Sequence, residues 1–244
     1  MDREPVEAVG RDDVHRGPGF AATAVAIVTY AVAMADVEAA VVVYLRAAYG
    51  LAVGDIFPLH EPVGADPFAT IEVGREAATL VMIGAVGWLV GRTGLERLAW
   101  AAVIFGIWDI GYYAGLSVMS GWPPSLGTWD LLFLIPVPWI GPVWAPIVVS
   151  AALVVTGLAA AARLRRAERF RIGTWQVAGG LSGGLLVVLS FTIDAARILD
   201  GDSPESFAWP LFLAGMIAAV TSAATALLRP YAASSGSSGR SVNE

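Results

Sequence analysis

The chain contains no cysteine and no lysine, and only two histidines among its 244 residues. Without cysteine it forms no disulfide, no thiolate zinc site and no iron–sulfur cluster. Without lysine it cannot hold retinal or another aldehyde as a Schiff base. His15 and His60 are expected on opposite sides of a membrane, so a bis-histidine haem cannot form within one chain. These absences exclude cofactor chemistry that depends on sulfur, on an amine or on paired imidazoles.

Apolar residues make up 57% of the chain, and the mean hydropathy is +0.67. A soluble domain is closer to half apolar, and here the apolar residues fall into blocks of bilayer-spanning length. The sequence therefore predicts an all-α fold, a polytopic membrane helix bundle in contact with lipid. Six transmembrane helices are expected, over residues 20–49, 67–91, 98–119, 143–162, 173–199 and 207–228. Together they form one domain over residues 20–228, and residues 1–19 and 229–244 are expected to be flexible cytoplasmic tails.

The segment LLFLIPVPWIGP, between the third and fourth predicted spans, is rich in proline. Pro136, Pro138 and Pro142 forbid a regular helix interior. We predict a short interfacial or re-entrant element, which is tolerated only where it is buried in protein or lines a cavity. Asp130 precedes this apolar run and is expected to cap a helix or turn.

Two further patterns predict how the helices pack and how the chain is oriented. The fifth predicted span holds a small-residue pattern that allows close approach of another helix. Its members are Gly179, Gly180, Gly183 and Gly184. Arginine is concentrated in the segments after the second and fourth spans, which the positive-inside rule places in the cytoplasm. These are Arg92, Arg97, Arg163, Arg165, Arg166, Arg169 and Arg171. We therefore predict a multi-pass protein of the cell (inner) membrane with both termini cytoplasmic, and no nucleic-acid partner.

Three acids lie at one depth within the predicted spans. A charge there is costly unless it faces a protein interior or a water-filled cavity. Counting about 1.5 Å of rise per residue places Glu38, Glu76 and Asp109 roughly 13–17 Å below the outer surface. Asp36 is deeper and points about 200° away from Glu38 around the helix. We expect the first three acids to share one chamber beneath the extracytoplasmic surface.

A shallower layer combines two acids with two arginines. Glu72 and Asp194 lie roughly 8 Å below the outer surface, near Arg75 and Arg197. Each arginine follows its acid by three residues, so each pair is also expected as an ion pair within one helix. The arginines neutralise two acids at most, and the remaining acids of a low-dielectric chamber must be protonated or must bind a cation.

Two chemistries follow from this arrangement. A carboxylic acid kept protonated is suited to general acid work or to a proton relay. The predicted catalytic side chains are Glu38, Glu76, Asp109 and Tyr112, and the predicted substrate-binding side chains are Glu72, Arg75, Trp108, Tyr113, Asp194 and Arg197. An oxygen ligand set suits a divalent ion such as Mg, Ca or Mn. For that case the predicted metal ligands are Glu38, Glu76, Asp109 and, from the loop, His60. A network that only fixes helix packing is the structural alternative.

Three function classes fit these residues. The first is a small membrane-embedded enzyme that acts on a lipid or isoprenoid-like substrate, a hydrophobic small molecule, by acid–base or divalent-metal chemistry. The second is a cation or proton transporter that uses the same carboxylates. The third is a non-catalytic membrane subunit whose acids pair with a partner protein. The sequence carries no Gly-rich phosphate loop, no nucleophile elbow and no His-Glu-x-x-His motif.

Overall fold

The computed structural model describes residues 19–52, 67–166, 172–199 and 206–228. Within them lie six helices that are long and apolar enough to span a bilayer. They are α1 (Phe20–Ala48), α2 (Pro67–Val90), α3 (Gly94–Ser120), α4 (Trp144–Arg165), α5 (Thr174–Thr192) and α7 (Trp209–Leu228). A short α6 (Ala195–Leu199) and two strands, β1 (Trp129–Phe133) and β2 (Trp139–Pro142), complete the described elements. The predicted all-α membrane bundle with six spans is confirmed, and the predicted tails lie outside the described residues apart from Gly19.

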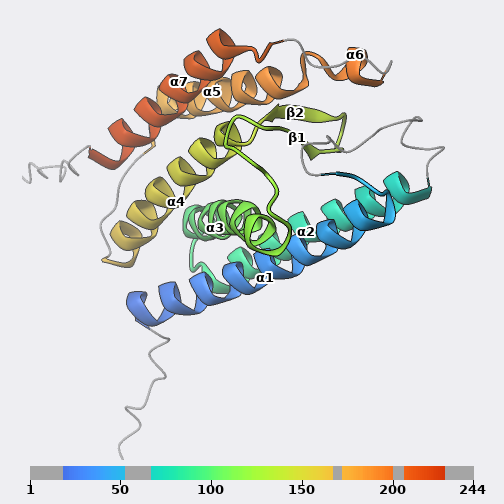
Figure 1. The fold of residues 1–244 in the computed structure, drawn as a ribbon. Coiled ribbons are helices and arrows are strands. Elements are labelled where there is room, and N and C mark those ends of the chain that lie inside the picture. Colours follow the sequence, from blue (N-terminus) through green and yellow to red (C-terminus); the bar gives the residue numbers. More distant parts are fainter. Residues whose placement is uncertain (1–18, 53–66, 167–171, 200–205, 229–244) are drawn as a thin grey trace, which may run out of the picture.

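Helix α3 is the central helix of the first four. It packs against α1, α2 and α4, whereas α5 packs mainly against α7 (Figure 1). Close approach to α1 depends on glycine: a Cβ at Gly111 would lie 2.8 Å from the Cβ of Ala35. One at Gly115 would lie 2.9 Å from the Cβ of Ala39. The α5–α7 pair contacts the rest of the bundle chiefly at two places: α7 packs against α4, and α5 packs against β2.

One face of α5 packs closely against α7 and another face does not, and glycines lie on both. A Cβ at Gly183 would lie 2.6 Å from the backbone nitrogen of Ala219 on α7, so only glycine allows this contact. Gly179 likewise faces α7, at Ser222. The predicted close approach of another helix is therefore confirmed for these two glycines. A Cβ at Gly180 or Gly184 would meet no atom within 4 Å, so these two turn away from α7.

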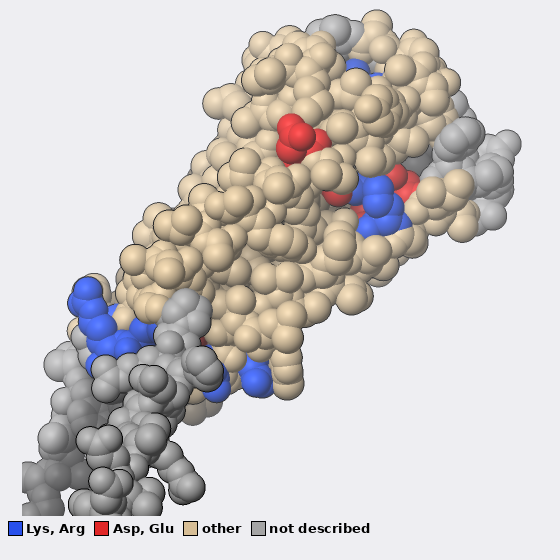
Figure 2. All heavy atoms as spheres, turned by 90° about the horizontal axis from the view of Figure 1, so that it is seen from below, with Lys and Arg blue, Asp and Glu red and all other residues tan. Residues whose placement is uncertain are grey.

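Charged groups are separated along the bundle. Five described arginines cluster where α2 and α4 end and α3 begins: Arg92, Arg97, Arg163, Arg165 and Arg166. Figure 2 shows basic groups at one end of an otherwise mostly uncharged surface, and acidic and basic groups together toward the other end. A surface of this kind, apolar around its middle, is suited to contact with lipid. Arg169 and Arg171 lie outside the described residues, and the orientation relative to the cytoplasm remains a prediction.

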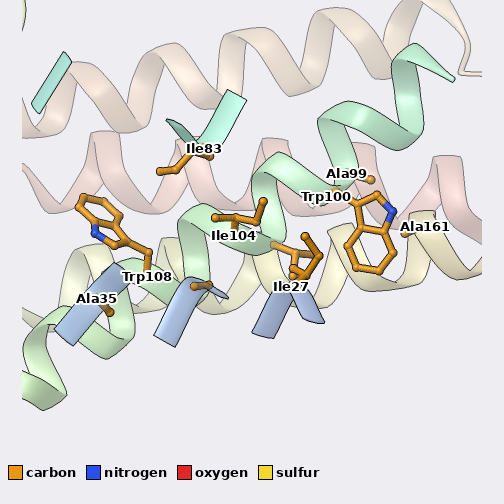
Figure 3. Close-up of a cluster of buried hydrophobic side chains, with 10 residues drawn as sticks. Ile27, Ala35, Ile83, Ala99, Trp100, Ile104, Trp108 and Ala161 are labelled. Carbon is orange, nitrogen blue, oxygen red and sulfur yellow. The ribbon is translucent and has the colours of Figure 1, made fainter. Parts of the chain in front are cut away.

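Between these two charged regions lies an apolar core built around α3. Trp100, Ile104 and Trp108 of α3 fill the space beside Ile27 of α1 and Ile83 of α2 (Figure 3). All five side chains are at most 5% exposed. Because lipid tails are as apolar as these side chains, close van der Waals packing, rather than removal from water, stabilises the contacts.

The proline-rich segment forms a β-hairpin. β1 pairs with β2 in antiparallel orientation, with Asp130 opposite Gly141 and Leu131 opposite Ile140. Pro136 and Pro138 lie in the connection between the strands, where no ladder hydrogen bond is lost. The expectation that Asp130 caps a helix or turn is wrong, because its backbone belongs to the strand ladder and α4 begins only at Trp144.

The third and fifth predicted spans differ most from the observed helices. α3 begins at Gly94 instead of residue 98, because Thr93 caps it by accepting a hydrogen bond from the Glu96 nitrogen (3.2 Å). The fifth predicted span is divided, since α5 ends at Thr192 and α6 follows after two residues.

Candidate functional site

A small polar cavity lies at the end of α1, α2 and α3 that is opposite the clustered arginines. We call it the chamber. Its volume of about 60 Å³ is room for a few water molecules or a small polar group. The polar and aromatic side chains that line it are Glu38, Arg46, Glu72, Arg75, Glu76, Thr79, Trp108, Asp109, Tyr112, Tyr113, Trp122, Asp130 and Phe133. The chamber thus joins side chains from three helices and from the segment that holds β1.

Arg75 connects two helices across the chamber. Its guanidinium forms ion pairs with Glu38 of α1 and with Glu72, one turn earlier on α2. The Arg75 Nε lies 2.9 Å from each carboxylate oxygen of Glu72. The side chains of Glu38 and Glu72 are only 10% and 13% exposed, so the ion pairs with Arg75 offset much of the cost of burying their charges.

Glu76 holds the hairpin against α2. Both of its carboxylate oxygens accept from the backbone nitrogen of Leu134, at 3.1 and 2.9 Å. Leu134 directly follows β1, so this nitrogen is not used in the strand ladder. The carboxylate is buried, and the contact fixes the chamber wall to the second helix.

Two further buried acids accept hydrogen bonds from hydroxyl groups. The Ser150 hydroxyl on α4 donates to Asp109 (2.8 Å), and the Tyr113 hydroxyl donates to Asp130 (3.0 Å). Among the described residues, neither acid forms an ion pair, and nor does Glu76. The chamber therefore holds three buried carboxyl groups whose hydrogen-bond partners are neutral.

The hairpin places Asp130 where it titrates near neutral pH. Burial raises its pKa from an ordinary value of 3.8 to about 7, and the nearby charge of Asp109 acts in the same direction. The hydrogen bond from Tyr113 and the charge of Arg46 act in the opposite direction without offsetting burial. A carboxyl group of this kind exchanges a proton readily near pH 7.

We predict that Asp130 makes the folded protein less stable as pH rises from about 4 to about 7. In that interval the folded chain keeps a proton that the unfolded chain has lost, so folding becomes less favourable with rising pH. A difference between pKa 3.8 and about 7 corresponds to ~4 kcal/mol. Melting temperatures in detergent from pH 4.5 to 8 measure it: Asp130→Asn is expected to flatten the curve. Parallel curves for wild type and variant contradict the prediction.

Arg46 and Tyr112 complete the polar lining. The guanidinium of Arg46 is buried, lies 4.8 Å from the ring centroid of Trp122 and donates to the Ala52 carbonyl (2.8 Å). The Tyr112 ring packs on that of Tyr113, with centroids 4.9 Å apart. Its hydroxyl has no hydrogen bond among the described residues, although it lies within electrostatic range of Arg75.

A larger apolar cavity adjoins the chamber. It has a volume of about 410 Å³ and lies between α3, α4, the hairpin and the α5–α7 pair. Asp109, Leu132 and Phe133 line both cavities, so they form a shared wall. Gly180 and Gly184 line it on α5, where side chains would otherwise occupy the space. A third apolar cavity of about 430 Å³ continues from it toward the clustered arginines.

No family model, curated protein or solved structure matches this chain.

The structure brings together most of the residues that the sequence singled out. Eight of them line the chamber: Glu38, Glu72, Arg75, Glu76, Trp108, Asp109, Tyr112 and Tyr113. Asp194 and Arg197 do not line it, because the end of α5 packs with α7 and the hairpin instead of with α1, α2 and α3. Asp36 is exposed on the outer flank of α1.

The metal prediction gains no support from this geometry. No group of three or more acids and histidines in the described ranges is arranged to hold a metal ion. For Glu38, Glu76 and Asp109 the reason is visible in their separate partners, which are Arg75, the Leu134 nitrogen and the Ser150 hydroxyl. His60, the fourth predicted ligand, lies outside the described residues.

Sequence reasoning missed Asp130 and Arg46 as chamber residues. The signal for Asp130 was present, since it adjoins a proline-rich element that was expected to line a cavity. Arg46 lies near the end of α1 and carried no sequence signal beyond its charge.

Proposed function

We propose that this integral membrane protein is an enzyme that acts on the polar end of a lipid or isoprenoid-like chain by acid–base chemistry. The observation that carries the proposal is the wall of Asp109, Leu132 and Phe133, which is common to the polar chamber and the apolar cavity. Adjoining polar and apolar spaces suit an amphiphile, because each part of the ligand meets surroundings of its own polarity.

The cavity volumes support this division of the ligand. About 60 Å³ in the chamber admits a small polar group and no more. About 410 Å³ beside it, lined mostly by aliphatic and aromatic side chains, offers room for part of an apolar chain. Since the apolar cavity adjoins lipid-facing helices, a chain can enter from the bilayer without crossing water.

Asp109 is the carboxyl group best placed for proton transfer. It lines both cavities, so the polar end of a chain lying in the apolar cavity meets Asp109 first. Glu76 and Asp130 also line the chamber and are further proton acceptors or donors, and Tyr112 offers a hydroxyl group. Arg75 pairs with Glu38 and Glu72 and so places a positive charge beside the reacting group. General acid–base catalysis by one positioned group contributes about 10²–10⁴-fold to a rate.

The test compares lipid extracts of native cells that lack the gene and are complemented with wild type or variants. We expect wild type to convert at least one lipid, and Asp109→Asn to lose that conversion by about 10²–10⁴-fold. The matched control is Asp194→Asn, which removes an acid that does not line the chamber. Mass spectrometry of the extracts measures substrate and product together.

A second pair of variants tests the apolar cavity separately. Gly184→Leu fills that cavity without a clash, since its Cβ would meet no atom within 4 Å. Gly84→Leu makes the same change on α2, where a Cβ would also meet no atom within 4 Å. Gly84 lines none of the three cavities described above. The proposal expects loss of conversion in the first variant alone. Identical lipid extracts from all strains, including the empty control, contradict it.

A cation or proton transporter is the second candidate, and three buried acids that form no ion pair with any described residue favour it. The core between the chamber and the clustered arginines counts against it, because Ile27, Ile83 and Ile104 leave no polar path there (Figure 3). Flux in proteoliposomes that is abolished by Glu76→Gln would establish transport. No wild-type flux under a proton or cation gradient removes this class.

A further inference from the structure

The charges that line the chamber are unbalanced. Among the described residues five acids face it, namely Glu38, Glu72, Glu76, Asp109 and Asp130, and two arginines, Arg46 and Arg75. With every group ionised, the lining carries three more negative than positive charges. Removing such charges from bulk water is costly unless protons or a bound cation offset them.

Both arginines are already engaged by the protein. Arg75 pairs with Glu38 and Glu72. Arg46 donates to the Ala52 carbonyl and lies over the ring of Trp122. The Leu134 nitrogen, which an anion would otherwise use, donates to Glu76. The described part of the chamber lining therefore offers no uncommitted arginine to a phosphate or carboxylate group.

Capacity for a cation remains, in contrast. A carboxylate has about four acceptor sites, and Asp109 and Asp130 each accept one side-chain hydrogen bond here. The aromatic rings of Trp108 and Tyr112 line the same space, and aromatic faces attract cations. Acceptor oxygens and aromatic faces together are the surroundings in which proteins bind ammonium groups.

We propose that the chamber binds the ammonium group of a long-chain amine whose apolar chain lies in the adjoining cavity, and that it rejects anionic head groups. This inference rests on the proposed function, because it assigns the polar end of the same ligand. It excludes lipid phosphates and isoprenoid diphosphates as substrates of this site.

The test compares three probes with the same chain and different head groups: dodecylamine, dodecanol and dodecyl phosphate. Wild-type protein in phosphatidylcholine nanodiscs at pH 8 is heated with each probe at equal concentration. The amine is protonated at this pH, so we expect it to raise the melting temperature most and dodecyl phosphate to have no effect. Binding isotherms from these shifts give the relative affinities.

Paired variants separate the chamber from general partition into the bilayer. The double variant Glu76→Gln, Asp109→Asn is expected to bind dodecylamine at least about tenfold more weakly. The double variant Asp36→Asn, Asp194→Asn removes the same formal charge from acids that do not line the chamber and is expected to bind as wild type does. Equal weakening in both double variants, or in neither, overturns the inference.

Two further outcomes also decide it. Dodecyl phosphate or dodecanol binding as tightly as dodecylamine overturns the ammonium assignment. If Gly184→Leu abolishes that binding, the proposed function survives with a different head group. If none of the three probes stabilises wild type, the ammonium assignment fails, and the lipid extracts decide the proposed function separately.

Discussion

Replacing Glu96 by alanine is expected to lower the free energy of unfolding by about 3–5 kcal/mol, because it leaves a buried guanidinium without its counter-charge. Glu96 is 2% exposed and accepts from the Arg165 Nε at 2.5 Å. The Trp100 indole nitrogen (3.3 Å) and the Arg92 backbone nitrogen (3.0 Å) donate to the same carboxylate. Thermal unfolding in detergent measures the effect, which corresponds to a fall of about 6–20 °C in melting temperature.

The effect is large because Arg165 joins four helices at this end of the bundle. Besides Glu96 of α3, it donates to the Thr23 hydroxyl of α1 (3.1 Å) and to the Val90 carbonyl of α2 (3.3 Å). It belongs to α4 itself.

Arg166→Gln is the matched control for Glu96→Ala, since Arg166 is adjacent in sequence but exposed. Replacing Glu96 and Arg165 together by methionine is expected to recover most of the lost stability, as the buried charge is then gone. Equal melting temperatures for Glu96→Ala and Arg166→Gln contradict the prediction.

The spans and the depth of their charges could be predicted from sequence because both follow from fixed helix dimensions. A block of about 20 apolar residues matches the bilayer, and a constant rise sets how deep each residue lies. Glu38, Glu76 and Asp109 come from three helices and line one chamber for that reason. The helical repeat also predicted that Asp36 and Glu38 lie on different faces of α1. In the structure Asp36 is exposed and Glu38 is buried.

Helix neighbours could not be predicted in the same way. Depth places Asp194 and Arg197 level with Glu72, but it does not determine which helix α5 packs against. Its glycines select α7, through contacts such as Gly183 with Ala219. Helices α1, α2 and α3 and the segment that holds β1 therefore enclose the chamber without the end of α5.

The hairpin was not predictable because strand pairing depends on two segments at once. Prolines at 136 and 138 excluded a helix, but neither strand carries a long alternating pattern. Asp130 was consequently interpreted as a cap, although the ladder of β1 and β2 turns its side chain toward Tyr113. The Glu96–Arg165 pair was missed for a related reason, since basic residues at span ends are explained by topology alone.

Replacing Arg75 by methionine is expected to cost about 3–5 kcal/mol of stability, because Glu38 and Glu72 then remain buried without a counter-charge. Thermal unfolding at pH 8 measures this loss. Arg75→Lys keeps the charge but not the two-sided geometry of the guanidinium, so an intermediate loss is expected. Adding Glu38→Gln and Glu72→Gln to Arg75→Met is expected to restore much of the stability, since no unpaired acid is left.

Wild-type stability of Arg75→Met contradicts the prediction, because water in the chamber would then solvate both carboxylates. An amphiphile head group would in that case face strong competition from water for Asp109, and the proposed acid–base chemistry would lose its low-dielectric setting.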